Sequence, residues 1–166
     1  MMIKKEYNSP LGRLVLVSDG SVLTGIWYFE QKHYPYALIA QCEEKPCAVL
    51  DQTACWLDAY FKGVVPTFTP PLSFEGTEFM KQVWSILMEI PYGETITYGA
   101  ISKLLADKRG VCKMSAQAVG GAVGRNPISI IIPCHRVVGA NGSLTGYAGG
   151  IDKKTFLLNL EKSCLK

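Results

Sequence analysis

A cysteine and a histidine stand side by side at the end of the apolar run IIIPCHRV, as Cys134 and His135. A thiol with an ordinary pKa of about 8.5 is mostly protonated at neutral pH, so nucleophilic chemistry needs a neighbouring base or positive charge. His135 and Arg136 are neighbours of that kind. The isoleucine-rich segment before Pro133 predicts a strand whose end presents Cys134 on a constrained backbone. The pattern therefore indicates a positioned sulfur nucleophile.

The imidazole of His135 is expected to act on Cys134 indirectly. Consecutive side chains on an extended chain point to opposite sides, so direct contact would require a turn in the backbone or an intervening water. We expect a carboxylate to orient the imidazole, and the C-terminal part of the chain offers only Asp107, Asp152 and Glu161. Glu161 lies in a segment that must pack back onto the core, although a solvated residue in a last helical turn is the default interpretation.

Other interpretations of the cysteines compete with a nucleophile. Free cysteines are most often small buried apolar residues, and we interpret the remaining five in this way. A zinc site from Cys42, Cys47 and either His33 or Cys55 lacks a CxxC pair or paired histidines, so no metal and no cofactor are expected. A cysteine hydrolase would also combine a thiol, an imidazole and an orienting polar group. The five cysteines are Cys42, Cys47, Cys55, Cys112 and Cys164.

Charge is unevenly distributed along the 166 residues. Residues 1–94 carry seven Lys and Arg against eleven Asp and Glu, whereas residues 95–166 carry ten against three. A basic block is commonly a solvated face, but it also suits a polyanion such as nucleic acid. The N-terminus has no apolar targeting segment, and no window approaches the roughly 20 apolar residues of a membrane span. We therefore expect no membrane partner. We also expect a cytoplasmic monomer, with cysteines that stay reduced because they lack the dense spacing of a disulfide scaffold.

The N-terminal part of the chain predicts a small antiparallel sheet with one helix. GRLVLVSDGSVLTGIWYF contains two β-branched runs joined at Asp19-Gly20, a pair favoured in tight hairpin turns. PCAVLDQTACWLDAYFKG has apolar residues at helical spacing, with Pro46 at a plausible first helical position. The proline-rich stretch VVPTFTPPLSFEG then places a boundary near residue 72. We expect an α+β protein with an N-terminal lobe over 1–72 and a second lobe over 73–166.

The second lobe is predicted to be helical, beginning with TEFMKQVWSILMEIPYG. Two short helices follow, capped by Thr97 and by Ser115, and their tight connection suggests helix-turn-helix geometry. The last helix, DKKTFLLNLEK, should be capped by Asp152. The inward positions expected in the first of the short helices and in the last helix are Ile101, Leu104, Leu105, Phe156, Leu157 and Leu160.

The segment SAQAVGGAVGRNP is an unusual helix, because Gly120 and Gly121 each cost about 1 kcal/mol of helix propensity relative to alanine. Close packing against another helix is one explanation. The other is a small-residue face that lies against a DNA backbone, which the nearby basic residues favour. These basic residues are Lys103, Lys108, Arg109, Lys113 and Arg125.

Together these features resemble a known family. IPCHRV, preceded by AVGGAVGRNP and followed by GSLTGYAGG, is similar to the active-site signature of the O6-alkylguanine-DNA alkyltransferases, also called methylated-DNA protein-cysteine methyltransferases. The similarity extends over the second lobe from GTEFMKQVW through PYGETITYGAISKLL to LLNLE, and in the first lobe only over SPLGRLVLVSDGSVLTGIW. The resemblance implies a ribonuclease-H-like N-terminal lobe with a three-stranded sheet and a helical, winged-helix-like C-terminal lobe.

By this resemblance, Cys134 takes the alkyl group from O6 of guanine in DNA, and His135 with Glu161 activates it through a water. The thioether is stable, so each molecule would react once, with O4-alkylthymine as a further substrate. Asn126 would brace the active-site segment, and Tyr98 would lie by the flipped base and assist departure of the guanine. The residues implied to line the substrate pocket are Val137, Tyr147, Ala148 and Gly149.

The resemblance also implies a mode of DNA binding. A stacked base must be flipped out to reach a buried sulfur, and the glycine-rich helix would enter the minor groove, where small residues fit. Where the family commonly has an arginine that fills the gap left by the flipped base, this chain has Gln117. We therefore expect weaker DNA affinity or slower flipping, softened by Arg125. The residues implied to contact double-stranded DNA are Thr97, Ser115, Ala116, Gln117, Ala118, Gly120, Gly121 and Arg125.

Two rival functions do without alkyl transfer. A non-catalytic relative would bind alkylated guanine and recruit other repair proteins, but such proteins typically replace the reactive cysteine, and Cys134 is present. A transcription regulator would account for the helix-turn-helix and the positive charge, but not for PCHRV. Alkyl transfer is the interpretation that uses all of these features.

Overall fold

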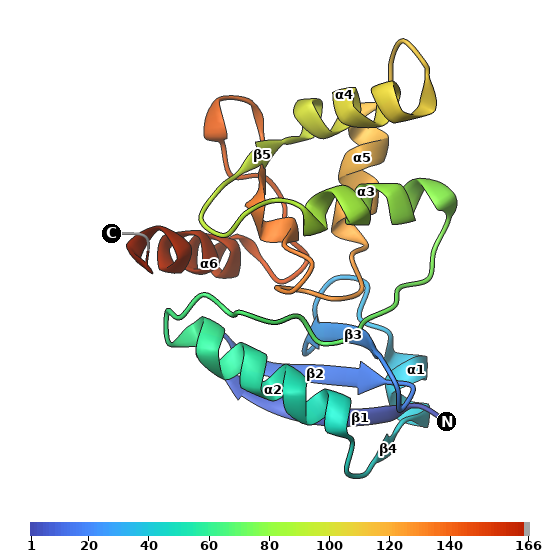
Figure 1. The fold of residues 1–166 in the computed structure, drawn as a ribbon, viewed down its shortest axis with the longest axis vertical. Helices are drawn as coiled ribbons and strands as arrows, with labels where there is room; N and C mark the ends of the chain where they lie inside the picture. The colour runs from blue at the N-terminus through green and yellow to red at the C-terminus, as the bar shows by residue number, and fades with distance from the viewer. Residues whose placement is uncertain (165–166) are drawn as a thin grey trace.

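The computed structural model describes residues 1–164. Figure 1 shows a sheet with its helices at one end of the long axis and a mostly helical lobe at the other, joined by the chain between α2 and α3. This segregation confirms the predicted α+β class. No helix in the described range has the length and apolar character needed to cross a membrane. The N-terminal elements are β1 (Ile3–Ser9), β2 (Gly12–Ser18), β3 (Leu23–Tyr28), α1 (Tyr36–Gln41), β4 (Glu43–Glu44) and α2 (Ala48–Phe61).

The N-terminal sheet has the order β3-β2-β1-β4, and all its pairs are antiparallel except β1 with β4. The predicted hairpin is confirmed, because the Asp19 carboxylate accepts from the backbone N–H of Ser21 at 2.8 Å and of Val22 at 3.0 Å. Gly20 adopts φ +103°, which a glycine tolerates best. Strand β1 has no counterpart in the sequence prediction, because its sequence IKKEYNS is largely polar. The two-residue β4 adds an edge to the three strands that the resemblance implied.

The two faces of this sheet are covered to different extents. Helix α2 buries Leu50, Leu57 and Tyr60 in the same core cluster as Leu14 and Leu16 of β2. The opposite face forms a smaller cluster that α1 only partly covers. The main core therefore lies on the α2 side of the sheet.

The C-terminal lobe contains the predicted helix-turn-helix, formed by α4 and α5. Thr97 Oγ1 accepts from Ala100 N–H and Ser115 Oγ accepts from Ala118 N–H, both at 3.1 Å, so both predicted caps are confirmed. The short parallel pair of β5 and β6 stands beside these helices. The C-terminal elements are α3 (Glu78–Met88), β5 (Ile96–Thr97), α4 (Tyr98–Arg109), α5 (Ala116–Gly124), η1 (Cys134–Arg136), β6 (Val137–Val138), η2 (Ala140–Gly142) and α6 (Ile151–Cys164).

The predicted strand before Cys134 is wrong. Residues 127–133 form turns with a single bridge from Ile128 to Ile26 of β3, and Ile130 adopts φ 71°. Cys134 opens the 3-10 turn η1 instead of ending a strand. These isoleucines fill the space between the two lobes. A short apolar run in such a buried turn has the same sequence pattern as a buried strand, which is why the prediction failed.

Four smaller predictions about helices are also wrong. Helix α6 begins at Ile151, so Asp152 lies in its first turn and not at its cap. The inward face of α6 carries Lys154, Leu157 and Glu161, which turns Phe156 toward solvent. Helix α4 buries Ile101, Ser102, Leu105 and Ala106, so Leu104 falls outside that face and is exposed. Pro46 precedes the N-cap Cys47 instead of occupying the first helical position.

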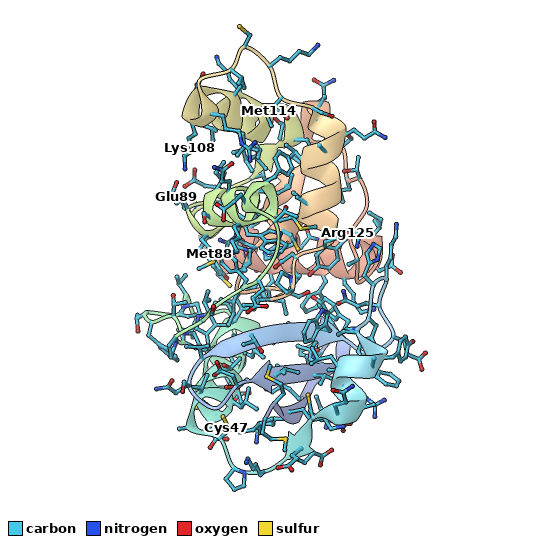
Figure 2. All side chains as sticks on the ribbon, turned by 90° about the vertical axis from the view of Figure 1, so that its right-hand side faces the viewer. Cys47, Met88, Glu89, Lys108, Met114 and Arg125 are labelled. Atoms are coloured by element: carbon cyan, nitrogen blue, oxygen red, sulfur yellow. The ribbon has the colours of Figure 1, made fainter. Side chains whose placement is uncertain are left out.

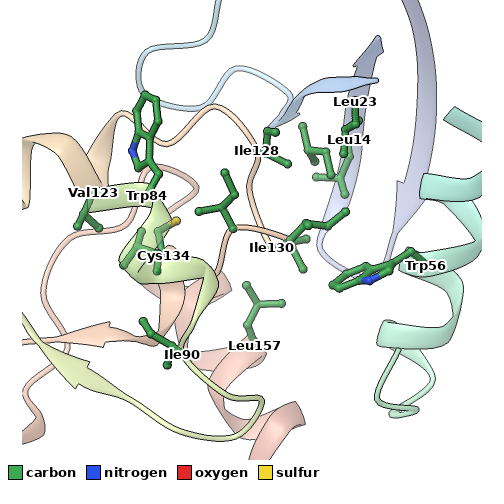
Figure 3. Close-up of a cluster of buried hydrophobic side chains, with 14 of the residues drawn as sticks. Leu14, Leu23, Trp56, Trp84, Ile90, Val123, Ile128, Ile130, Cys134 and Leu157 are labelled. Atoms are coloured by element: carbon green, nitrogen blue, oxygen red, sulfur yellow. The ribbon is translucent and has the colours of Figure 1, made fainter. Parts of the chain in front are cut away.

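The two lobes share one continuous core. Ile26 N–H donates to Pro127 O at 2.9 Å, and Ser129 N–H donates to Ile26 O at 3.1 Å. Figure 3 shows Ile128 and Ile130 between side chains of the N-terminal sheet and helix on one side and of the C-terminal lobe on the other. The segment that leads to Cys134 is therefore held by both lobes.

Candidate active site

Cys134 is buried at the start of η1, with 6% of its surface exposed. Figure 3 shows its sulfur among apolar side chains that include Trp84 and Val123. The backbone before it is braced by Asn126, whose Nδ2 donates to Ile132 O at 2.8 Å and whose Oδ1 accepts from Ile128 N–H at 2.9 Å. Asn126 thus closes the turn that delivers the thiol, which is the bracing position expected for it.

Burial raises the pKa of the Cys134 thiol to about 11, although the Asn126 side chain and the charge of Lys154 act in the opposite direction. At neutral pH the resting side chain is therefore a thiol. A proton acceptor is needed before the sulfur can act as a nucleophile.

His135 and Glu161 form a buried pair, with His135 Nε2 at 2.6 Å from Glu161 Oε2. Burial lowers the pKa of His135, against the opposing pull of Glu161, so the imidazole is neutral at pH 7. With a carboxylate as partner, Nε2 carries the hydrogen and donates it. Nδ1 is then a lone-pair acceptor, and it is buried without a hydrogen-bond partner among the described residues. This atom is available as a base toward a water or a thiol.

Glu161 is held by more donors than the imidazole alone. Arg136 donates to it through Nε at 2.8 Å and through Nη2 at 3.1 Å, and Gly93 N–H donates at 3.0 Å. Tyr60 Oη of α2 donates to Oε2 at 2.6 Å. Burial favours the neutral acid, but the hydrogen bonds from His135 and Arg136 and the positive charge of Arg136 outweigh it and hold the pKa of Glu161 well below its usual range. The carboxylate therefore remains ionised and fixes the tautomer of His135.

Lys154 is the second buried cation near the site. Its ammonium donates to Val137 O at 2.5 Å and to Thr145 O at 3.2 Å, so one side chain joins the strand after η1 to the loop over residues 143–150. Burial lowers the pKa of Lys154, and a negative charge on Cys134 opposes this shift. Formation of a thiolate and retention of the ammonium thus favour each other.

The predicted pocket residues come from three segments of the C-terminal lobe. Val137 is buried directly after η1. Tyr147, Ala148 and Gly149 are half-buried in the loop before α6, with Tyr147 Oη at 2.9 Å from Tyr28 Oη of β3. Tyr98 at the start of α4 accepts a hydrogen bond from Thr145 Oγ1 at 3.2 Å, which leaves its own hydroxyl proton for another acceptor. The structure thus brings the loop and the helix-turn-helix together.

Helix α5 presents most of its predicted DNA-contacting residues to solvent. A Cβ added at Gly121 would meet no atom within 4 Å, and one at Gly120 would approach only the Tyr98 ring, at 3.8 Å. Close packing against another helix therefore does not explain these glycines. In Figure 2, Arg125 and Lys108 lie in the same lobe, whereas Cys47 is at the far end of the molecule. The exposed members of the predicted set are Ser115, Ala116, Gln117, Ala118, Gly121 and Arg125, while Thr97 and Gly120 are partly buried.

Three contributors to this site carry no signal in the sequence. Tyr60 and Tyr28 come from the N-terminal lobe, and only contacts between residues far apart in the sequence bring them to Glu161 and Tyr147. Lys154 belongs to the basic C-terminal block, and nothing in the neighbouring sequence marks it as buried. Arg136 is predicted to act on the thiol as a nearby charge, but its guanidinium binds Glu161.

All six cysteines are free, but they do not gather into a metal site. Within residues 1–164 no group of three His, Cys, Asp or Glu side chains has the arrangement to hold a metal ion.

The fold and the site define a class of protein in which a buried cysteine, followed in the chain by a histidine of a buried His–Glu pair, belongs to the same lobe as a helix-turn-helix. Residues 2–74 match the family described as 6-O-methylguanine DNA methyltransferase, ribonuclease-like domain, and residues 78–163 match the family described as 6-O-methylguanine DNA methyltransferase, DNA binding domain. The chain belongs to the 6-O-methylguanine DNA methyltransferase family. The resemblance inferred from PCHRV is thereby confirmed.

Similar proteins match over nearly the whole chain. The methylated-DNA–protein-cysteine methyltransferase of Methanosarcina acetivorans is 44% identical, with 95% of this chain and 97% of that protein covered. The protein of the same name from Mycobacterium bovis is 46% identical, with coverage of 98% and 94%. The crystal structure of Mycobacterium tuberculosis OGT in complex with DNA has a TM-score of 0.83 and 44% identity, and covers 97% of this chain and 93% of that one.

Proposed function

We propose that this protein repairs DNA by moving the alkyl group of O6-alkylguanine onto Cys134, once per molecule. The observation that carries the proposal is the buried Cys134 next to a neutral His135 whose Nδ1 is unpaired and whose Nε2 is tied to ionised Glu161. The relatives' name, methylated-DNA–protein-cysteine methyltransferase, agrees with it. O4-alkylthymine is proposed as a further substrate.

The reaction begins with removal of the thiol proton. His135 Nδ1 takes it through a bridging water, which puts a positive charge on an imidazole already facing the Glu161 carboxylate. The resulting thiolate attacks the alkyl carbon in line with the carbon–oxygen bond. A sulfur–carbon bond forms, the carbon–oxygen bond breaks, and the electron pair leaves with guanine O6. The guanine anion then takes up a proton at N1, so that O6 becomes a carbonyl oxygen. Tyr98 donates a hydrogen bond to that oxygen as charge develops, and the net proton passes from the thiol to guanine.

DNA binding delivers the lesion to this buried sulfur. A base inside a duplex cannot reach a side chain with 6% exposure, so the nucleotide must be flipped out at a cost of a few kcal/mol. We propose that the open face of α5 lies in the minor groove and that Gln117 fills the gap in the stack, with Arg125 against a phosphate. Thr97 and Ser115 act mainly through the helix starts that they cap.

The experiment is the intact mass of the protein after incubation with excess duplex DNA that carries one O6-methylguanine, followed by peptide mapping. We expect a single added methyl group on Cys134 that saturates at one per chain. Cys134→Ser is the control and should gain nothing. An unchanged mass with tight lesion binding would make the protein a non-catalytic sensor, and repeated turnover of an ester or peptide would make it a cysteine hydrolase.

We propose a cytoplasmic location, which the six free cysteines support because thiols stay reduced in that compartment. We also propose that the protein is a monomer. We also propose a lobe boundary near residue 72, supported by matched segments that end at 74 and resume at 78.

A further inference from the structure

Tyr28 belongs to the N-terminal lobe but touches the loop assigned to the substrate pocket. It is the last residue of β3, is 2% exposed, and places its hydroxyl 2.9 Å from the hydroxyl of Tyr147. The two rings meet edge to face, with centroids 5.8 Å apart. This geometry holds the Tyr147 side chain in one orientation.

The same strand end fastens the backbone of the pocket loop. Lys32 N–H, just beyond β3, donates to Ala148 O at 3.2 Å. A Cβ at Gly149 would lie 2.7 Å from the Tyr28 ring, so the backbone of Gly149 passes directly against that ring. The turn after Tyr28 is itself fixed, because Gln31 Oε1 accepts from Tyr28 N–H at 2.9 Å. The conformation of Ala148 and Gly149 therefore depends on a residue outside their own lobe.

The hydroxyls of Tyr28 and Tyr147 have two O–H protons, but only one of these protons is used in the hydrogen bond between them. Each phenol has one proton to donate, and among the described residues each hydroxyl has only the other as its partner. One proton of the pair is spent in that bond, and the other is left without an acceptor. Tyr28 and Cys134 belong to the same core cluster, and Tyr147 packs against that cluster. Burial is the dominant cause that raises the pKa of Tyr28 and of Tyr147, and a negative charge on Cys134 raises both further. The remaining O–H is thus a donor for charge that appears at the sulfur or on the bound base.

We propose that Tyr28 is a positioning residue for alkyl transfer, which orients the Tyr147 hydroxyl toward the reacting groups and fixes the loop of Ala148 and Gly149 against the pocket. This inference rests on the proposed function. Tyr28 lies on the sheet lobe, away from the exposed face of α5. Its hydroxyl should therefore affect the rate of the chemical step and leave DNA affinity unchanged.

The test is a double-mutant cycle with Tyr28→Phe and Tyr147→Phe, which keep both rings and remove the hydroxyls. Single-turnover transfer from O6-methylguanine duplex is measured with excess protein, and DNA affinity is measured separately in a Cys134→Ser background. We expect Tyr28→Phe to lower the rate about threefold to tenfold, as for loss of one hydrogen bond, with no change in affinity. The double variant should be no slower than Tyr147→Phe alone, since Tyr28 acts through Tyr147. Tyr36→Phe, on exposed α1, is the matched control and should keep the full rate.

Three results would overturn the positioning role. They are a full transfer rate for Tyr28→Phe, rate losses that multiply in the double variant, and a loss of DNA affinity equal to the loss of rate. Multiplying losses are also what a general loss of folded protein would produce, so the cycle separates positioning from structure. Absence of transfer in the unsubstituted protein overturns the proposed function instead, and the role of Tyr28 with it.

Discussion

The two lobes supply different kinds of group to one site. The C-terminal lobe contributes the groups that ionise, Cys134, His135 and Glu161. The N-terminal lobe contributes two buried tyrosines, Tyr28 and Tyr60, whose hydroxyls stay neutral because burial raises the pKa of both. A neutral donor orients a charged partner without cancelling its charge. We propose a division of roles on this basis, in which the C-terminal lobe holds the reacting groups and the N-terminal lobe fixes their orientation.

The largest effect should follow from removing the nucleophile in the C-terminal lobe. Cys134→Ser replaces a thiol by a hydroxyl that His135 cannot deprotonate to a useful extent, so we expect transfer to fall more than about 1,000-fold. DNA affinity should be retained, because Cys134 is buried away from α5's exposed face. Transfer is followed with radiolabelled methyl groups. A radiolabelled methyl group bound stably to the Cys134→Ser variant would mean that another residue accepts the alkyl group. The reacting group would then not be assigned to Cys134 of the C-terminal lobe.

The next effect concerns the carboxylate on which both lobes converge. Glu161→Gln removes the charge opposite Arg136 and leaves a buried cation unpaired, so the free energy of unfolding should fall by about 3–5 kcal/mol. Transfer should also slow, because the amide can turn its NH₂ toward Nε2 and favour the wrong tautomer. Urea unfolding and single-turnover rates measure the two effects. Glu75→Gln, at an exposed position of the connection between the lobes, is the control and should change neither.

Acid should weaken the protein through the same pair. Burial holds the pKa of His135 below 6.5, so below that pH the unfolded chain binds a proton that the folded chain does not. Stability should then fall by up to about 1.4 kcal/mol per pH unit between pH 6.5 and 5. The low pKa of Glu161 adds a further loss below about pH 4.5, where the unfolded carboxyl takes up its proton first.

Urea midpoints at several pH values distinguish this source of acid sensitivity from others. His135→Gln should flatten the curve between pH 6.5 and 5, since it retains a donor to Glu161 without titrating. His33→Asn should leave the curve unchanged, because His33 is exposed and asparagine tolerates its φ of 64°. An equally steep curve in His135→Gln would assign the effect to other groups.

Sequence predicted the parts of the fold that are encoded by neighbouring residues. Thr97 and Ser115 cap their helices, and Asp19-Gly20 turns the hairpin, because each signal acts within three residues. The pairing of Cys134 and His135 is visible for the same reason. Local signals of this kind predict these two helix starts, the hairpin turn and the Cys–His pair, but they misplaced the starts of α2 and α6.

The rest depends on contacts between distant segments. Tyr60 and Glu161 are 101 positions apart, and Tyr28 and Tyr147 are 119 apart, so no periodicity connects them. Lys154 looks like a surface lysine until the backbone carbonyls of Val137 and Thr145 surround it. The isoleucines of 127–133 match a buried strand in composition, and only the packing of two lobes makes them turns. Sequence patterns therefore could not predict that Tyr28 and Tyr60 of the N-terminal lobe contribute to the site.

Tyr60 offers a moderate and more specific test of that contribution. Around His135 stand Glu161 and Lys154 of α6, Arg136 beside it, and Tyr60 of α2. Without the Tyr60 hydroxyl, Glu161 attracts the Nε2 proton more strongly, so the pKa of His135 rises. We expect Tyr60→Phe to move the acid limb of the transfer rate to higher pH, and to cost about 1–3 kcal/mol of stability.

The matched control for Tyr60 is Tyr7→Phe in the same lobe. Tyr7 Oη also donates to a carboxylate at 2.6 Å, that of Asp58, but at the surface. Its loss should leave the pH profile in place and change stability by less than about 0.5 kcal/mol. Identical pH profiles for Tyr60→Phe and the unsubstituted protein would mean that α2 supports the site only by packing.

The smallest effect is expected on the outer surface of the C-terminal lobe. Gln117 is exposed on α5 and carries no charge, so Gln117→Arg adds one positive charge to the helix face that we propose to lie in the minor groove. We expect DNA affinity or transfer rate to rise a few-fold. The DNA-binding constant should also depend more steeply on salt concentration, by about one released counterion. Gln52→Arg adds the same charge to exposed α2 in the N-terminal lobe and should do neither. Unchanged DNA affinity and transfer rate in Gln117→Arg would mean that the neutral side chain of Gln117 does not weaken DNA binding or slow transfer. An equal gain in Gln52→Arg would mean that net charge, and not the position on α5, determines DNA binding.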